Sequence, residues 1–163
     1  MKRKLGLLLA ISALLLSACM ATGQKSAPGD AIGSVDPDKL LQDYGVFAEA
    51  YRQYQPDGDD LDAMARLEGK GLIVMFGTWC HDSEREVPRL LKLLDESQVK
   101  IAWLQLVAVD RHKQEPSGLN RQYQLHYTPT IILLSEGEEV GRIVEKPQKS
   151  LAADLAALAD RAP

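Results

Sequence analysis

Cysteine is scarce in this chain of 163 residues, which contains only Cys19 and Cys80. Histidine is scarce as well, and its three residues, His81, His112 and His126, are scattered along the sequence. Two separate cysteines and scattered histidines lack the close ligand spacing of a structural zinc site. We therefore expect no metal site, and no motif in the chain calls for another cofactor.

Long apolar runs are missing apart from one at the N-terminus. The stretch from Leu5 to Leu16 is too short to span a bilayer comfortably, and it follows a basic segment as in a signal peptide. It ends in Leu16-Ser17-Ala18-Cys19, which resembles the lipobox of bacterial lipoproteins. The resemblance implies a signal peptide over residues 1–18 and a lipidated Cys19, carrying palmitate-type chains, as the first mature residue. The alternative is an ordinary signal peptide or N-terminal anchor with an incidental cysteine.

Lipidation would place the protein in the bacterial cell envelope, held to a membrane by its N-terminal lipid. In bacterial lipoproteins an aspartate directly after the lipidated cysteine favours the inner membrane. This chain has Met20 at that position. The resemblance therefore implies the outer membrane, with the domain facing the periplasm. Loss of residues 1–18, which carry three basic and no acidic side chains, would shift the formal net charge from −4 to −7. An acidic domain argues against nucleic acid or anionic lipid as the main partner. Cys80 would remain as a lone thiol, unable to form an internal disulfide.

The composition divides the mature chain into a tether, a helical extension and a domain. Residues 19–35, rich in Ala, Gly, Ser, Thr and Pro, are expected to form a flexible tether. The extension, 36–70, should contain a helix that starts at Asp36-Pro37 and a short second helix over 61–67. The domain, 71–163, alternates strands and helices in the order β-α-β-α-β-β-α. The expected ranges are 72–76, 83–96, 101–109, 117–124, 130–134, 140–144 and 151–159.

This order predicts an α/β fold with a mixed sheet flanked by helices. Two parallel crossovers followed by an antiparallel hairpin are expected. Trp103 is interpreted as a core residue, and the segment 110–113 as a solvated loop.

Cys80 lies where a buried strand ends and a helix begins. Free N–H groups and the helix macrodipole favour a thiolate at such a position without any metal or cofactor, and a protonated His81 would help. Asp82, Glu84 and Glu86 oppose this effect through their negative charge. The other interpretation is an inert, packed cysteine, the usual fate of a lone Cys. The polar flanking residues and the strand-end position favour a reactive one.

The segment Phe76-Gly77-Thr78-Trp79-Cys80-His81-Asp82-Ser83 resembles the active-site strand, turn and helix start of the thioredoxin superfamily. Glu86-Val87-Pro88-Arg89-Leu90 follows at the spacing of its membrane-tethered TlpA/ResA-like branch, with Pro88 where these proteins kink the helix. The resemblance covers roughly residues 70–160. It implies a thioredoxin-like fold with Cys80 as nucleophile and Trp79 and His81 beside it.

Tyr127-Thr128-Pro129-Thr130 resembles the cis-proline loop of the same superfamily. The resemblance implies that Pro129 is cis and that the loop faces the reactive cysteine. Thr128 would then offer main-chain hydrogen bonds to an extended substrate, a form of β-augmentation. A plain trans turn is the alternative for an isolated X-Pro pair.

Three positions depart from the superfamily pattern. Ser83 replaces the second cysteine, and although its hydroxyl can hydrogen-bond a thiolate it cannot resolve a mixed disulfide. Val74 occupies the place of a buried acid that many thioredoxins carry. Glu145 stands where a glycine is usual near the end of the fourth strand, either beside the site or as a solvated strand-end charge.

Three functions from different classes fit these residues. The first is a monothiol oxidoreductase or isomerase, in which Cys80 attacks a protein or glutathione-type disulfide and an external thiol resolves the adduct. The second is a binding or thiol-capture module that holds a peptide in the cis-proline groove. A third is an envelope protein that keeps the fold without the activity.

Overall fold

The computed structural model describes residues 28–162. The predicted signal peptide, the lipidation of Cys19 and the first part of the predicted tether lie outside the described residues. Within that range, no helix is long and apolar enough to cross a membrane.

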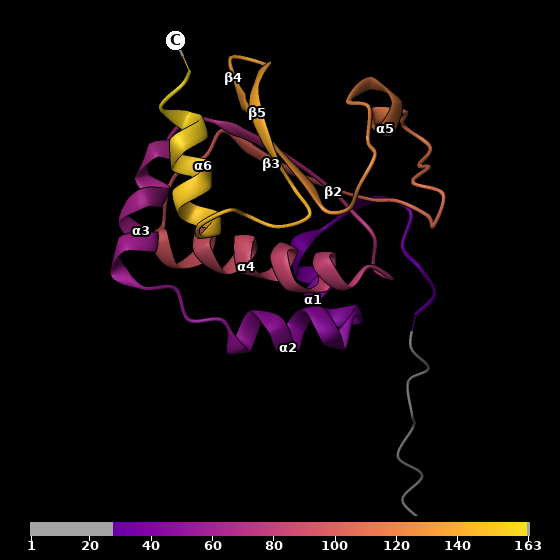
Figure 1. Cartoon of the computed structure of the whole chain (residues 1–163). Helices are drawn as coiled ribbons and strands as arrows, with labels where there is room; N and C mark the ends of the chain where they lie inside the picture. The colour runs from indigo at the N-terminus through magenta and orange to yellow at the C-terminus, as the bar shows by residue number, and fades with distance from the viewer. Residues whose placement is uncertain (1–27, 163) are drawn as a thin grey trace, which may run out of the picture.

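Five strands form one mixed sheet in the order β1-β3-β2-β4-β5 (Figure 1). The central strand β2 pairs parallel with β3 and antiparallel with β4. The outer strands β1 and β5 pair antiparallel with their neighbours. The strands are β1 (Gly33–Val35), β2 (Gly71–Phe76), β3 (Trp103–Ala108), β4 (Thr130–Ser135) and β5 (Glu138–Val144).

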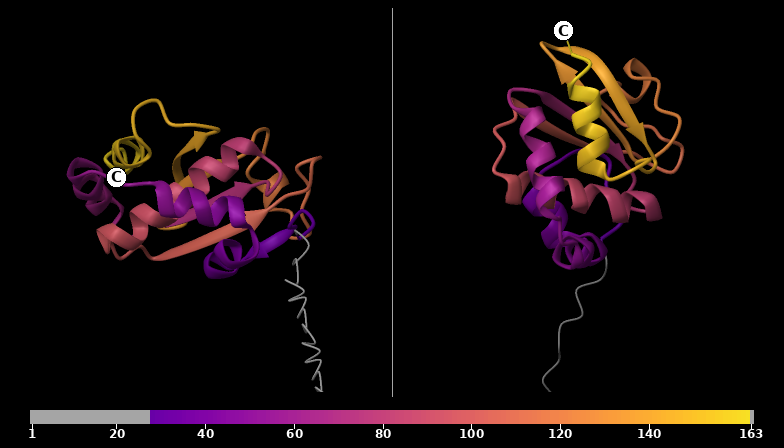
Figure 2. Two further views of the ribbon diagram at one scale, coloured as in Figure 1. Left: turned by 90° about the horizontal axis from the view of Figure 1, so that it is seen from below. Right: turned by 60° about the vertical axis from the view of Figure 1, so that its left-hand side comes forward.

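The helices cover the two faces of the sheet unequally, and Figures 1 and 2 show α5 on the other side of the sheet from α4. One face carries the large core with α1, α2, α3, α4 and α6, whereas the other carries a small cluster with the region around α5. The helices are α1 (Pro37–Asp43), α2 (Gly45–Gln53), α3 (Gly58–Met64), α4 (His81–Ser97), α5 (Leu119–Gln122) and α6 (Leu151–Ala159), and a short 3₁₀ turn (Ala65–Leu67) follows α3. The α/β, thioredoxin-like architecture predicted from the sequence is confirmed.

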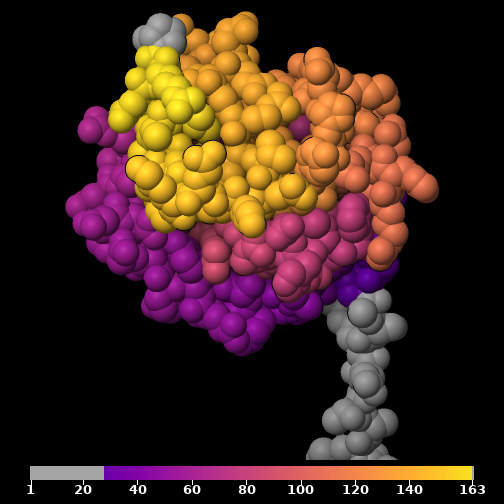
Figure 3. Space-filling view, in the orientation of Figure 1, coloured from indigo at the N-terminus to yellow at the C-terminus, as the bar shows by residue number. Residues whose placement is uncertain are grey.

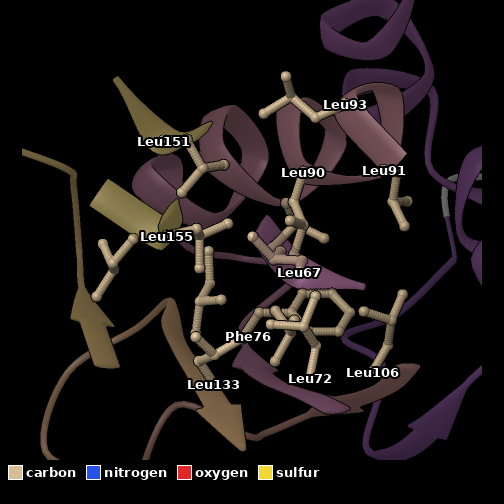
Figure 4. Close-up of a cluster of buried hydrophobic side chains, with 14 of the residues drawn as sticks. Leu67, Leu72, Phe76, Leu90, Leu91, Leu93, Leu106, Leu133, Leu151 and Leu155 are labelled. Atoms are coloured by element: carbon tan, nitrogen blue, oxygen red, sulfur yellow. The ribbon is translucent and has the colours of Figure 1, made fainter. Parts of the chain in front are cut away.

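The core forms around β2, whose six residues are all buried as its apolar run predicted. Side chains alternate across a strand. Leu72 and Phe76 therefore point into the large cluster with Leu90 of α4, which Figure 4 shows, while Ile73 and Met75 point into the small one. Burial on both faces fixes the register of β2, because a slip of one residue would exchange the two sets.

One strand was not predicted. Gly33–Val35 was assigned to the tether, but it forms β1 and pairs with the end of β3, with Gly33 opposite Ala108. Three residues are too few to show the alternation that marks a strand, and their small polar composition resembles that of a linker. The ordered domain therefore begins before residue 35.

The second crossover was also predicted wrongly. It was expected to be parallel, but β4 runs antiparallel to β2, so only β2 and β3 form a parallel pair. A long connection permits either direction, and the sequence pattern of a buried strand is the same in both.

Trp103 was predicted to be a core residue, but its side chain is 42% exposed. It is the first residue of β3, at the rim of the sheet, where its ring covers Gly71.

Helix boundaries differ from the expected ones where capping decides them. The first predicted helix is split at Tyr44, whose backbone is extended, into α1 and α2. The second begins earlier than expected because the Asp57 side chain accepts a hydrogen bond from the Asp60 amide and caps it. The predicted helix over 117–124 is reduced to the single turn of α5.

The helical extension packs directly on the active-site helix. Tyr51 of α2 donates a hydrogen bond of 2.6 Å from its hydroxyl to Asp95 of α4. The Lys92 ammonium lies 4.7 Å from the centre of the Tyr51 ring, so the two helices are also joined by a cation–π contact. The hydrogen bond to the Asp95 carboxylate raises the pKa of Tyr51 to about 12.

Tyr51→Phe tests this contact between α2 and α4. We expect the free energy of unfolding in urea to fall by about 1 kcal/mol, the usual net value of one such hydrogen bond. Because the pKa of Tyr51 is raised in the folded state, this contribution should be complete below pH 10 and vanish as the pH approaches 12. Tyr123→Phe is the control, since the structure gives the Tyr123 hydroxyl no hydrogen bond within residues 28–162. Equal losses in both variants would contradict the assignment.

Candidate active site

Cys80 occupies the junction between β2 and α4. It is the N-cap residue of α4 and is partly buried. Its amide donates a 3.0 Å hydrogen bond to the Gly77 carbonyl, which closes the turn after β2, and its carbonyl accepts the Glu84 amide at 2.9 Å in the first turn of the helix. The apolar run of β2 and the helix signals of α4 therefore place this thiol at the positive end of a 17-residue helix.

The cis-proline loop lies directly against this thiol. The Thr128–Pro129 peptide bond is cis, and the Cys80 Sγ lies 3.1 Å from the Thr128 carbonyl oxygen, to which the thiol donates. Thr128 is buried. The neighbouring Tyr127 is 57% exposed, and its carbonyl accepts the Thr130 hydroxyl at 2.8 Å. The structure thus brings Cys80, Thr128 and Pro129 together, as the resemblance implied.

Ser83 is fully buried one helical turn after Cys80. Its hydroxyl oxygen accepts the Gly77 amide at 3.2 Å, and among residues 28–162 this is the only hydrogen bond that the structure gives its side chain. The hydroxyl at the resolving position therefore holds the turn that carries Cys80.

Trp79 is held by its indole ring. The indole N–H donates a 3.0 Å hydrogen bond to the Val109 carbonyl, and the ring lies so close to Gly77 that a Cβ there would be 2.5 Å from it. On the other side, the Arg111 guanidinium lies 5.6 Å from the ring centre. Only glycine leaves room for this packing, which gives the glycine of the motif a steric reason.

Each carboxylate at the start of α4 has a basic partner. Asp82 pairs with Arg85 at 2.7 Å, and His81, whose side chain is 91% exposed, has its Nδ1 3.5 Å from Glu84. Buried Glu86 accepts from Arg85 at 2.5 Å through Oε1, a hydrogen bond that raises the pKa of Arg85. The carboxylates of Asp82 and Glu86, which were expected to oppose a thiolate, therefore lie beside the positive charge of Arg85.

Glu86 also borders a cavity of about 490 Å³ between α4 and the segment that follows β5. Its second oxygen, Oε2, is buried and has no hydrogen-bond partner among residues 28–162. Arg89, Lys146 and Lys149 line the same cavity. Within the described part of the chain, no group of acidic, histidine or cysteine side chains is arranged to hold a metal ion.

Glu145 lies on the exposed rim of the site, close to the cis-proline. Its amide donates a 2.8 Å hydrogen bond to the Pro129 carbonyl, and its backbone has φ of +60°. Left-handed backbone of this kind suits glycine. The left-handed backbone explains why the superfamily pattern predicts glycine at this position. Glu145 adopts the same left-handed backbone although it carries a side chain.

Sequence reasoning missed one part of the site, the N-terminal segment. The Ala31 amide donates a 3.0 Å hydrogen bond to the Thr78 hydroxyl, and Asp30 pairs with Arg111 at 3.0 Å. Arg111 lies in a loop with its side chain 66% exposed, as predicted for the segment 110–113, and it also joins the N-terminal segment to the Trp79 ring, a role that was not predicted. The partners are 47 and 81 residues apart in sequence, so no local pattern could have indicated them.

Comparisons with known proteins concern the fold. No family model and no curated protein match the sequence. Among solved structures the chain is similar to an HIV epitope scaffold, with 17% identity over 76% of this chain and 87% of the scaffold and a TM-score of 0.57. It is also similar to a protein of unknown function from Pseudomonas aeruginosa, with 20% identity over 75% of each chain and a TM-score of 0.50.

A looser likeness is found to mitochondrial thioredoxin 3 from Saccharomyces cerevisiae, with 18% identity, 58% of this chain and 86% of that chain covered, and a TM-score of 0.36. The strand order, the cysteine at the start of α4 and the cis-proline opposite it define a thioredoxin-like fold.

Ser83→Ala tests the structural role of the buried hydroxyl. The Gly77 amide would lose its acceptor inside the protein, so we expect the free energy of unfolding to fall by about 1–3 kcal/mol. Ser34→Ala, at an exposed position of β1, is the control and should change it by less than about 0.5 kcal/mol. An unchanged stability in Ser83→Ala would show that the turn does not depend on this hydrogen bond.

Glu145→Gly tests the left-handed position. Glycine adopts this backbone without steric cost, so the variant should be more stable by about 1 kcal/mol in urea unfolding. Glu138→Gly, at the first residue of β5, where φ is not positive, should instead be less stable, by at most about 0.5–1 kcal/mol. Destabilisation by both substitutions would mean that the Glu145 side chain contributes more than its backbone costs.

Proposed function

We propose that this protein is a lipid-anchored protein of the bacterial cell envelope that performs thiol–disulfide exchange through Cys80 as its single nucleophile. The observation that carries the proposal is the Cys80 thiol at the N-terminus of α4, 3.1 Å from the carbonyl of the residue before a cis-proline. The start of a helix is a position at which cysteines are commonly reactive, and the loop offers main-chain groups to a substrate beside the thiol. The lipobox-like sequence at Cys19 supports the anchor, with the outer membrane as its site and the periplasm as its compartment.

The proposed reaction is a pair of exchanges without net oxidation or reduction. The Cys80 thiolate attacks one sulfur of a protein or glutathione-type disulfide, so a bond forms to that sulfur, the disulfide breaks, and the other sulfur leaves as a thiolate. An external thiol then attacks the adduct through its own thiolate and releases Cys80. Ser83 cannot perform this second step, because a hydroxyl does not attack a disulfide as a thiolate does. Its oxygen also already accepts a hydrogen bond from the Gly77 amide.

Deprotonation of Cys80 also changes the substrate-facing loop. In the structure the Thr128 carbonyl accepts a hydrogen bond from the protonated Cys80 thiol. When that proton is lost the carbonyl is free to accept a main-chain N–H of an extended peptide, the interaction by which a strand is added to an edge. Nucleophile activation and substrate binding are thus linked at one oxygen atom.

The alternative function is capture rather than turnover. The lack of a resolving thiol removes the internal route by which a mixed disulfide escapes, and an adduct on Cys80 therefore persists until another thiol arrives. The same site then acts as a binding module for a peptide with a reactive sulfur.

Incubation of the mature chain carrying Cys19→Ser with a glutathionylated peptide distinguishes these functions. We expect the intact mass to show one glutathione or peptide adduct, and added glutathione to release it over many cycles. Cys80→Ser should form no adduct. Ser83→Cys supplies the missing thiol, and we expect it to release the adduct without added glutathione as an internal disulfide forms. A wild-type adduct that glutathione does not release would favour capture, and the absence of any adduct would contradict both functions.

A further inference from the structure

We infer that the active site faces the membrane and that Cys80 acts on a thiol or disulfide of a protein held at that same membrane. This inference rests on the proposed lipidation of Cys19 and on the proposed exchange chemistry. It comes from the place where the described chain begins, which is beside the active site rather than at the far side of the domain.

Two contacts fasten the N-terminal segment to the active-site turn. The Ala31 amide bonds the hydroxyl of Thr78, two residues before the nucleophile. Asp30 pairs at 3.0 Å with Arg111, whose guanidinium lies over the ring of Trp79. Thr78 and Trp79 directly precede Cys80 in the turn after β2, so the segment is fastened to the turn that carries the nucleophile.

Further contacts prevent this segment from swinging away. β1 pairs with the end of β3 through Gly33 and Ala108, immediately after the segment. Before it, the Tyr44 hydroxyl donates a 2.8 Å hydrogen bond to the Gly29 carbonyl. In Figure 3 the indigo start of the described chain touches the pink start of α4 and the neighbouring orange loop, while the C-terminus lies at the opposite end. The point of departure from the domain is therefore fixed next to Cys80.

The length of chain outside this point limits the distance to the membrane. Ten residues lie between Cys19 and Asp30, so eleven Cα–Cα steps separate the two. Fully extended, they span at most about 40 Å. A domain of this size has a diameter of roughly 35 Å. Because the tether leaves the domain beside the site, Cys80 stays within reach of the membrane surface. A tether attached at the C-terminal end would increase the distance from the membrane to Cys80 by most of a domain diameter.

The surface around the site fits a polypeptide partner. The described chain has five exposed large apolar side chains, and four of them belong to segments that contact or adjoin the site residues. Ile32 follows the N-terminal segment, Val46 shares a cavity with His81, Tyr127 belongs to the cis-proline loop, and Val144 lies opposite Thr130 in the sheet. An apolar rim around a nucleophile suits an extended peptide better than a small, charged thiol. The inferred partner is therefore a protein segment that the same membrane holds near its surface.

The experiment uses the native lipidated protein in phosphatidylcholine vesicles. One disulfide-bearing peptide is offered either in solution or linked by a short spacer to phosphatidylethanolamine in the same vesicles. We expect adduct formation on Cys80 to be much faster with the membrane-linked peptide, since both reactants share one surface. Mass analysis of the same protein checks that Cys19 carries the lipid.

A matched pair of variants separates orientation from mere confinement. Both variants carry Cys19→Ser and a histidine tag that anchors them to nickel-chelating lipid. In the first variant the tag stands before residue 20. In the second it follows residue 162, joined by a spacer with the sequence of residues 20–30. We expect the N-terminally anchored form to react at least about tenfold faster with the membrane-linked peptide, and both forms to react equally with the soluble peptide.

Equal rates with the membrane-linked peptide, or a faster C-terminally anchored form, would overturn the inference while leaving the exchange chemistry intact. An unmodified Cys19 in the native protein would overturn it as well. Failure of both forms with the soluble peptide would instead refute the proposed exchange reaction itself.

Discussion

The antiparallel pairing of β2 and β4 is the constraint on which the active site depends. Cys80 follows the end of β2, and Thr128 precedes the start of β4. Antiparallel neighbours bring the end of one strand beside the start of the other, and Met75 indeed lies opposite Thr130. The 3.1 Å contact between the thiol and the Thr128 carbonyl follows from this register. If β4 ran parallel to β2, the start of β4 would lie beside the start of β2. The cis-proline loop would then be at the other end of the strands, a strand length away from Cys80.

This constraint also explains where sequence reasoning succeeded and where it failed. The apolar run of β2 and the helical spacing of α4 lie within short stretches, so the position of Cys80 at their junction could be read from local patterns. The direction of β4 could not, because a buried strand has the same composition in either direction. The motif around Pro129 carried information that the strand pattern lacked: a loop that faces Cys80 requires the antiparallel arrangement, and the expectation of two parallel crossovers was inconsistent with it.

The parts of the site that sequence could not indicate are those built from distant residues. Asp30, Arg111 and Trp79 come from three separate segments, and each looks ordinary in its own surroundings. Small polar residues before β1 resemble a linker, and a charged segment after β3 resembles a solvated loop. Their roles depend on the closeness of β1 to β3 and of β3 to β2, which is a property of the assembled sheet. By contrast, the steric role of Gly77 is local, since the ring that requires it belongs to Trp79 two residues later.

The substitutions around Cys80 form a consistent set. Val74 is fully buried among apolar side chains, so no buried carboxylate lies there to accept a proton from a second thiol. Ser83, at the place of that second thiol, uses its oxygen to hold the turn at Gly77. Within residues 28–162 the site therefore offers one thiol, Cys80, and the proposed exchange needs an external thiol to release it. In the proposed reaction another molecule must release Cys80, and this release is fastest where that molecule is concentrated. With Cys19 lipidated as proposed, the N-terminal segment fastened to Thr78 and Arg111 would hold the site near partners at the same membrane.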